Sequence, residues 1–202
     1  MMLDAPAAER NRAPILEVLR KELPSTGLVL EVASGSGLHA VYLARALTPR
    51  AWLPTDRAED ALESIEERRL ESGLVNLRPA QRLDVTEEDW PVCTADAVVC
   101  INMLHIAPWK AAEGLFKGTA RLLPEEAPLC TYGPYRFGGE FTAESNAIFD
   151  GDLRRRNPAW GVRDVDDLSR LGDRVGLHLA AVHPLPANNH VLVFRRGGSP
   201  PR

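Results

Sequence analysis

The sequence has few cysteines and histidines, and neither residue type has the spacing of a metal site or a disulfide framework. Its 202 residues include three cysteines, Cys93, Cys100 and Cys130, and no two of them are close enough in sequence to suggest a zinc site. The five histidines are also scattered along the chain. Structural zinc sites need closely spaced Cys or His ligands, so we expect no metal and no disulfide framework.

Long apolar runs are absent as well. A membrane-spanning helix requires about 20 consecutive apolar residues, and no run in this sequence approaches that length. The N-terminal residues include Asp4, Glu9, Arg10 and Arg12, where a signal peptide would have an apolar core. These absences predict a cytoplasmic protein that does not associate with a membrane.

The sequence lacks a surplus of positive charge. It has 24 Lys and Arg against 28 Asp and Glu, which gives a formal net charge of −4. A protein that binds DNA through a broad surface normally carries a basic patch or stripe, so we expect no DNA partner. The run Arg154-Arg155-Arg156 is more typical of a solvated helix face, but it leaves an RNA or protein acceptor open.

Helical and strand-like patterns alternate along most of the chain. The spacing of apolar residues predicts helices over 15–23, 38–47, 58–72, 110–123 and 165–175, and strands over 28–33, 52–55, 75–79, 96–101, 129–133, 177–183 and 190–195. This order predicts an α/β fold, with a doubly wound and mostly parallel sheet, helices on both faces and an antiparallel final strand pair. We expect a single domain over 1–202 with a frayed tail at 197–202, either as a monomer or as a homodimer.

Residues 135–163 do not fit the alternation of helices and strands. This segment is rich in aromatic and polar residues and follows a predicted strand, which is typical of a lid or a substrate wall. Together with flanking positions it provides a candidate acceptor pocket for a small molecule. The candidate residues are Tyr132, Tyr135, Asn146, Trp160, Arg163 and Asn188.

The most informative segment is the first predicted strand and the turn after it. The apolar run from Leu28 contains one carboxylate, Glu31, and ends in a turn with Gly35 and Gly37. A buried carboxylate needs a partner because it loses its hydration, and glycines allow a ligand to approach the backbone closely. In a doubly wound sheet ligands bind at the carboxyl ends of the strands, so this segment predicts a nucleoside-cofactor pocket.

Two nucleoside cofactors compete for this pocket. The segment from Gly35 to Ala40 fits the dinucleotide pattern G-x-G-x-x-A, and Asp56 follows at about the expected spacing. Glu31 argues against a dinucleotide, since its charge would repel a pyrophosphate. No lysine follows the glycines as in a P-loop, so hydrolysis of a nucleoside triphosphate has little support.

S-adenosylmethionine (SAM) is the alternative that a carboxylate near the turn favours, because its sulfonium and ammonium groups are cationic. Asp56 comes directly after the second predicted strand and can accept hydrogen bonds from both ribose hydroxyls. Asp84 can accept from the adenine amino group while Val85 packs against the ring. Asp84 could also simply begin a turn before Thr86.

The series formed by Glu31, Gly35, Gly37, Asp56, Asp84 and the strand at 96–101 resembles the motifs of class I methyltransferases. The whole chain resembles the methyltransferase-like 26 family, through the segments 6–12, 30–37, 83–85, 101–105, 131–135, 157–161 and 185–189. The resemblance implies a seven-stranded methyltransferase fold and SAM binding, but no particular substrate. The cofactor contacts it implies come from Glu31, Ala33, Gly35, Gly37, Asp56, Asp84, Val85 and Asn102.

The segment Asn102-Met-Leu-His105 resembles small-molecule O- and C-methyltransferases and lacks the Asn-Pro-Pro-Tyr motif of amino-methyltransferases. His105 could act as a general base, since an unperturbed histidine has a pKa near 6.5. It could equally pack under the adenine or bond to the backbone. Tyr132 is a second candidate catalytic residue, and it could also simply pack below the sheet edge.

The N-terminal segment supplies a further cofactor hypothesis. In the class I methyltransferase fold this segment often folds over the cofactor, so we expect Arg10 or Asn11 to hold the methionine carboxylate, a group that arginine binds well. His39 lies in the first turn of a helix, where the helix dipole opposes protonation. It is therefore expected to support the site rather than to catalyse.

The sequence thus predicts a SAM-dependent methyltransferase that acts on an unidentified small molecule. Three alternatives remain open: a non-methyl use of SAM such as an intramolecular displacement, a non-catalytic SAM-binding partner protein, and a dinucleotide oxidoreductase.

Overall fold

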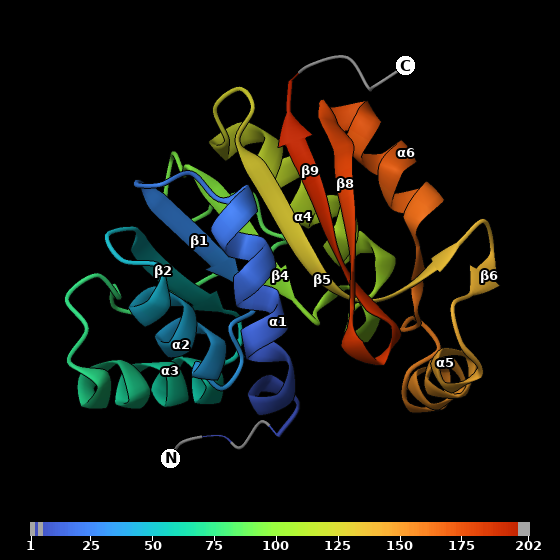
Figure 1. Ribbon diagram of the computed structural model, residues 1–202, viewed down its shortest axis with the longest axis horizontal. Helices are drawn as coiled ribbons and strands as arrows, with labels where there is room; N and C mark the ends of the chain where they lie inside the picture. Colours follow the sequence, from blue (N-terminus) through green and yellow to red (C-terminus); the bar gives the residue numbers. More distant parts are fainter. Residues whose placement is uncertain (1–2, 4–5, 198–202) are drawn as a thin grey trace.

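The computed structural model describes residue 3 and residues 6–197, which form a central twisted sheet with helices on both faces (Figure 1). The strand order along the main path is β3-β2-β1-β4-β5-β9-β8. These strands are β1 (Leu28–Val32), β2 (Ala51–Asp56), β3 (Gln81–Arg82), β4 (Ala97–Ile101), β5 (Pro128–Phe137), β8 (Leu177–Leu185) and β9 (Asn189–Arg196). The first five run parallel to one another, and β9 runs antiparallel to both β5 and β8. The predicted fold class, including its antiparallel final pair, is confirmed.

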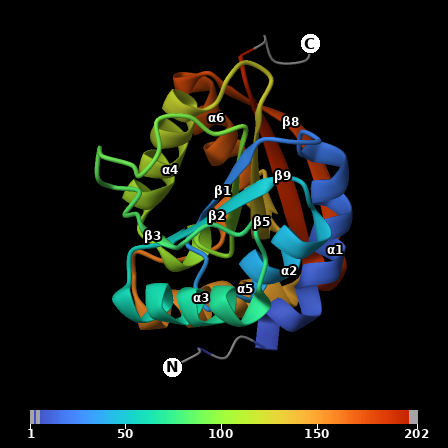
Figure 2. The ribbon, with the colours of Figure 1, turned by 90° about the vertical axis from the view of Figure 1, so that its left-hand side faces the viewer.

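Helices cover the two faces of the sheet in separate groups, as a view along the sheet shows (Figure 2). On one face α1 (Pro6–Glu22) packs against α2 (Leu38–Ala46), and on the other α4 (Trp109–Leu122) packs against α6 (Val165–Val175). The helix α3 (Glu59–Ser72) contacts α2 and β2. None of the helices in the described part of the chain is both long and apolar enough to cross a bilayer.

Alternate residues of the central strands face two separate hydrophobic cores. Leu30 and Val98 point into the core under α4 and α6, whereas Val29 and Val99 point into the core under α1 and α2. Strand side chains alternate between the two faces, so a strand buried on both sides is apolar at nearly every position. This double burial explains why the short apolar runs in the sequence were recognisable as parallel strands.

The structure differs from the prediction in the third strand. The segment 75–79 makes only one isolated bridge, between Leu77 and Trp52, and the strand that pairs with β2 is β3 at Gln81–Arg82. Pro79 has no N–H to donate, and the Asn76 side chain donates to backbone carbonyls of Ala44 and Arg50. The segment is therefore held by two backbone hydrogen bonds with Trp52 and by the Asn76 side chain, and it is not a regular strand.

Two further boundaries differ from the prediction. The first helix begins well before residue 15, at Pro6, and contains Pro14 within it. The fifth strand extends past residue 133 to Phe137. The region 135–163 then contains β6 (Glu140–Phe141), α5 (Glu144–Arg156) and β7 (Arg163–Asp164), with β6 and β7 both paired to β5. Of the tail expected at 197–202, all but Gly197 lies outside the described residues.

The loop after β3 reaches the sheet because α4 has glycine where the loop crosses it. A Cβ placed on Gly114 would lie 2.1 Å from the carbonyl oxygen of Val85, and one on Gly118 would lie 2.1 Å from the Trp90 ring. Backbone cannot move aside as a flexible side chain can. Gly114 therefore determines how deeply Val85 can sit at the ends of the strands.

We expect Gly114→Ala to destabilise the protein by about 2–3 kcal/mol, because the added methyl group collides with backbone in a packed core. The matched control is Gly151→Ala in α5, where the nearest atom to an added Cβ is 3.8 Å away. That change should be neutral or stabilise by about 0.5–1 kcal/mol, since alanine is the better helix former. Urea denaturation measures both, and equal effects of the two changes would contradict the packing argument.

Candidate functional site

A cavity of about 660 Å³ lies where the carboxyl ends of β1, β2 and β4 meet; we call it the strand-end cavity. Parallel strands present these ends at one edge of the sheet, so residues far apart in sequence come together there. The residues lining it include Ala33, Gly35, Asp56, Asp84, Val85 and Asn102, which were all singled out from the sequence. Gly37 and Glu31 do not line it.

The turn after β1 approaches the strand-end cavity in a left-handed backbone conformation. Ala33, Gly35 and Gly37 have φ values of 58°, 55° and 82°. A Cβ on Gly35 would meet nothing within 4 Å, so this glycine faces open space that a ligand can occupy. A Cβ on Gly37 would lie 2.9 Å from the Cα of Ile65. Gly37 therefore allows α3 to pack, and it does not line the strand-end cavity with the other residues predicted for the cofactor.

Asp56 ties the turn after β1 to the end of β2. Its Oδ2 accepts a hydrogen bond from the Gly35 N–H at 2.9 Å, and its Oδ1 accepts from the Ala58 N–H at 3.1 Å. Each carboxylate oxygen can accept more than one hydrogen bond. Asp56 therefore orders the turn and can still accept from hydroxyl groups of a ligand.

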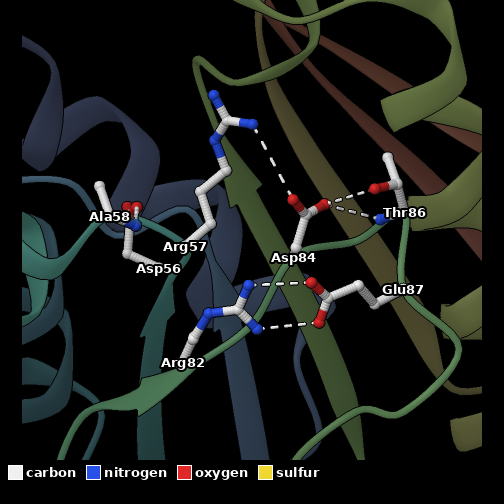
Figure 3. Close-up of polar contacts among 7 residues, drawn as sticks. All are labelled: Asp56, Arg57, Ala58, Arg82, Asp84, Thr86 and Glu87. Atoms are coloured by element: carbon white, nitrogen blue, oxygen red, sulfur yellow. Dashed lines mark hydrogen bonds and ion pairs between the residues drawn. The ribbon is translucent and has the colours of Figure 1, made fainter.

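Asp84 is held in a turn at the rim of the strand-end cavity (Figure 3). Its Oδ1 accepts from the N–H and hydroxyl of Thr86 at 2.9 and 2.8 Å, and Arg57 lies 3.9 Å from Oδ2. Partial burial raises the pKa of Asp84, but the Thr86 hydrogen bonds and the charges of Arg57 and Arg82 outweigh it and lower the pKa. Asp84 therefore forms the turn that the sequence allowed and also faces the cavity as a carboxylate.

Arg57 is a lining residue that the sequence reasoning missed. Its exposed side chain extends from the end of β2 toward Asp84, while Arg82 pairs with Glu87 through two hydrogen bonds of 2.8 Å (Figure 3). The position of Arg57 directly after Asp56 was the available signal. Lys110 also lines this cavity, so two acids and two cations surround it.

Glu31 is buried beneath the site and does not face it. Its side chain is 1% exposed, and its Oε2 accepts a hydrogen bond from the Trp52 indole N–H at 2.6 Å. Burial raises the pKa of Glu31 to about 7, although the Trp52 hydrogen bond works in the opposite direction. The expectation that Glu31 faces a cationic ligand is wrong, because the alternation along β1 turns it into the core under α1 and α2.

A second cavity of about 520 Å³ adjoins the first; we call it the α5 cavity. It is lined by Arg10, Asn11, Pro14, Asn102, His105, Tyr132, Pro134, Ser145, Asn146, Phe149, Pro186, Ala187 and Asn189. Asn102 lines both cavities, and its backbone, at φ 63°, donates to the carbonyl of Tyr132 at 2.9 Å. The two cavities therefore share one lining residue, and it directly follows the end of β4.

The two N-terminal candidates lie in the α5 cavity. Arg10 and Asn11 line it, and Ala8 is the residue of α1 that lines the strand-end cavity. Asn11 connects the two, because its Oδ1 lies 2.7 Å from Nε2 of His39, which lines the strand-end cavity. Burial, with a smaller effect of Arg12, lowers the pKa of His39 to about 4, as expected for a supporting residue.

His105 lies in the α5 cavity, but it is far from an unperturbed histidine. Burial lowers its pKa to about 4, and the nearby charge of Arg163 adds to the effect. Its ring meets Phe149 edge-on at 5.6 Å, and a Cβ on Gly133 would lie 3.0 Å from its Nδ1. His105 is therefore neutral at pH 7, and the expectation of a pKa near 6.5 is corrected.

Three predicted acceptor residues have structural roles, and none of them lines either cavity. Tyr135 is fully buried and donates its hydroxyl to Oγ1 of Thr131 at 2.9 Å. Arg163 donates to backbone carbonyls, including that of Leu104 at 2.9 Å. Asn188 offers its carbonyl to the Asn146 amide at 3.1 Å.

The remaining acceptor candidates lie at the cavities. Asn146 and Tyr132 line the α5 cavity, whereas Trp160 lines the strand-end cavity together with Asn157. Burial raises the pKa of Tyr132, and a hydrogen bond with Asn11 opposes this rise. The phenol therefore remains protonated at neutral pH.

Comparison with known proteins places the chain in a family and identifies its fold. A family model described as a protein of unknown function (DUF938) matches residues 2–196. An O-methyltransferase family protein from Burkholderia thailandensis is 14% identical with a TM-score of 0.78, over 96% of this chain and 58% of that one. An O-methyltransferase family 2 protein from Planctomyces limnophilus, in complex with apigenin, is 16% identical with a TM-score of 0.76, over 94% and 60%.

Human N-acetylserotonin methyltransferase, in complex with SAM, is 12% identical with a TM-score of 0.74, over 95% of this chain and 53% of that one. The chain thus spans 53–60% of the length of these three proteins. At such low identity the similarity establishes the fold, which is that of class I methyltransferases.

The buried Glu31 predicts a pH dependence of stability that Glu31→Gln should remove. Its pKa of about 7 lies above the ordinary value of 4.5, so its contribution is complete below pH 4.5 and is lost as the pH rises through 7. Between pH 4.5 and 8 the wild type should lose about 3 kcal/mol more stability than the variant, whose amide oxygen can still accept from Trp52.

Urea denaturation at several pH values measures the free energy of unfolding of the wild type and of Glu31→Gln as a function of pH. His39 and His105 have lowered pKa values in both proteins, so their destabilising effect at acidic pH cancels in the comparison. Parallel curves would show that Glu31 does not bind a proton more tightly in the folded state.

Proposed function

The chain belongs to the DUF938 family, and we propose that it is a SAM-dependent methyltransferase that acts on a small molecule. The observation that carries the proposal is the pair of adjoining cavities that share Asn102. One cavity has carboxylates that can accept from the ribose hydroxyls and the adenine amino group of a nucleoside, and the other has room for an acceptor. The resemblance to the methyltransferase-like 26 family supports the same proposal.

The strand-end cavity fits SAM in its size and its donor and acceptor groups. Asp56 would accept hydrogen bonds from the ribose hydroxyls, and Asp84 would accept from the adenine amino group beside Val85. The open space at Gly35 lets the ligand approach the backbone of the turn. When bound, SAM supplies a methyl group that its sulfonium already activates.

The residues of the α5 cavity would hold and orient the acceptor. Asn102, His105 and Tyr132 line it on the side of the strands, and Asn146 and Phe149 line it from α5. We assign the segment 135–163 the role of an acceptor wall through α5. Enclosing the reacting groups excludes water, and holding them in line supplies most of what methyl transfer needs from a protein.

Isothermal titration calorimetry tests the choice of cofactor directly. The wild-type protein should bind SAM and should show no heat of binding with NAD. Binding of NAD without binding of SAM would overturn the proposal.

The role of Asp56 can be tested by Asp56→Ala. The change should weaken SAM binding by about 2 kcal/mol, or roughly 30-fold, because it leaves ribose hydroxyls unpaired and loosens the turn at Gly35. Asp60→Ala is the matched control, since Asp60 is an exposed carboxylate in α3 that lies outside both cavities. Equal affinities of the two variants for SAM would contradict the assignment of Asp56.

A further inference from the structure

Negative charge is divided unevenly between the two cavities. Asp56 and Asp84 line the strand-end cavity, whereas none of the described residues that line the α5 cavity is acidic. Arg10, exposed on α1, is the cation at the α5 cavity. A protonated amine would lose its hydration in this cavity without gaining a carboxylate partner. The α5 cavity therefore suits an anion better than a cation.

Hydrogen-bond donors in the α5 cavity lie next to the boundary with the strand-end cavity. The Tyr132 side chain has a hydrogen bond with Asn11, and a phenol hydroxyl can donate one hydrogen bond while it accepts another. Asn102 lines both cavities, and a side-chain amide can donate two hydrogen bonds. By contrast, the amide group of Asn146 already donates to Thr142 and Asn188. Tyr132 and Asn102, which are joined by a backbone hydrogen bond of 2.9 Å, can therefore offer donors to an anionic acceptor in the α5 cavity.

The α5 cavity lacks a group suited to remove a proton from an alcohol. Its ionisable side chains, among the described residues, are Arg10, His105 and Tyr132. His105 is held against Gly133 and Phe149, and burial together with the charge of Arg163 lowers its pKa to about 4. So weak a base accepts a proton poorly from an alcohol or a phenol with a pKa of about 10 or more.

We propose that the acceptor is a small carboxylic acid that reacts through its carboxylate, so that the product is a methyl ester. This inference rests on the proposed function, because it names the acceptor of the same site. A carboxylate arrives at the site already ionised at neutral pH. One of its oxygens forms a bond to the methyl carbon, and the bond from that carbon to sulfur breaks with its electron pair remaining on sulfur. The products are the ester and S-adenosylhomocysteine, and no proton is transferred.

The experiment uses the full chain, SAM with a tritium-labelled methyl group and a low-molecular-mass cell extract as the source of acceptors. Mild alkali hydrolyses methyl esters to methanol, which is volatile, but leaves methyl ethers and N-methyl groups intact. We expect most of the transferred label to be released as methanol. Label that resists alkali would overturn the inference, and so would a protein that binds SAM but labels nothing in the extract. A protein that does not bind SAM would instead overturn the proposed function.

Arg10→Gln, compared with Arg12→Gln, tests whether the α5 cavity recognises an anion. Both changes remove one positive charge from α1, but Arg12 pairs with Glu9 at 2.7 Å, lies over the Tyr42 ring and does not line the cavity. At a saturating concentration of SAM and a limiting concentration of extract, Arg10→Gln should lower methyl transfer about tenfold, and Arg12→Gln should change it less than about twofold. Equal transfer by the two variants would overturn the inference.

Discussion

Ser34 and Thr55 join β1 to β2 at the point where their regular pairing ends, and the rest of the site depends on this junction. Pro54 stands opposite Glu31 and has no N–H to donate, but the Thr55 hydroxyl donates to the Glu31 carbonyl at 2.7 Å. The Ser34 N–H donates to the Thr55 carbonyl at 2.8 Å, and the Thr55 N–H donates to Oγ of Ser34 at 3.2 Å. With both residues buried, these bonds determine where the next residues, Gly35 and Asp56, emerge.

The two cavities are built in different ways, which explains why the strand-end cavity was easier to predict from the sequence than the α5 cavity. Residues at the ends of parallel strands are positioned by backbone pairing, so a strand pattern followed by an acid already indicates a place in space. The α5 cavity collects side chains from α1, the ends of β4 and β5, α5 and the turn at residues 186–188. No local pattern connects these segments, because their proximity arises from tertiary packing alone.

The fold and much of the lining of the strand-end cavity could be predicted for this reason, and the exceptions have specific causes. Asp56, Asp84 and Asn102 follow strands and were placed correctly at the strand-end cavity. Glu31 lies within a strand, and the pattern of an apolar run does not reveal that Trp52, on the neighbouring strand, supplies its partner. The sequence predicted a strand that ends at residue 133, so Tyr135 was assigned to the acceptor pocket. The strand β5 extends to Phe137, and this extra length buries the Tyr135 ring.

One consequence follows from the separate origin of the α5 cavity. Neither α5 (Glu144–Arg156) nor the turn at residues 186–188 contributes a residue to the lining of the strand-end cavity. Changes in these segments reshape what the second cavity admits and leave the junction of β1 and β2 untouched. Related proteins with this architecture can therefore change the lining of the α5 cavity while they keep that of the strand-end cavity, so the two cavities need not evolve at the same rate.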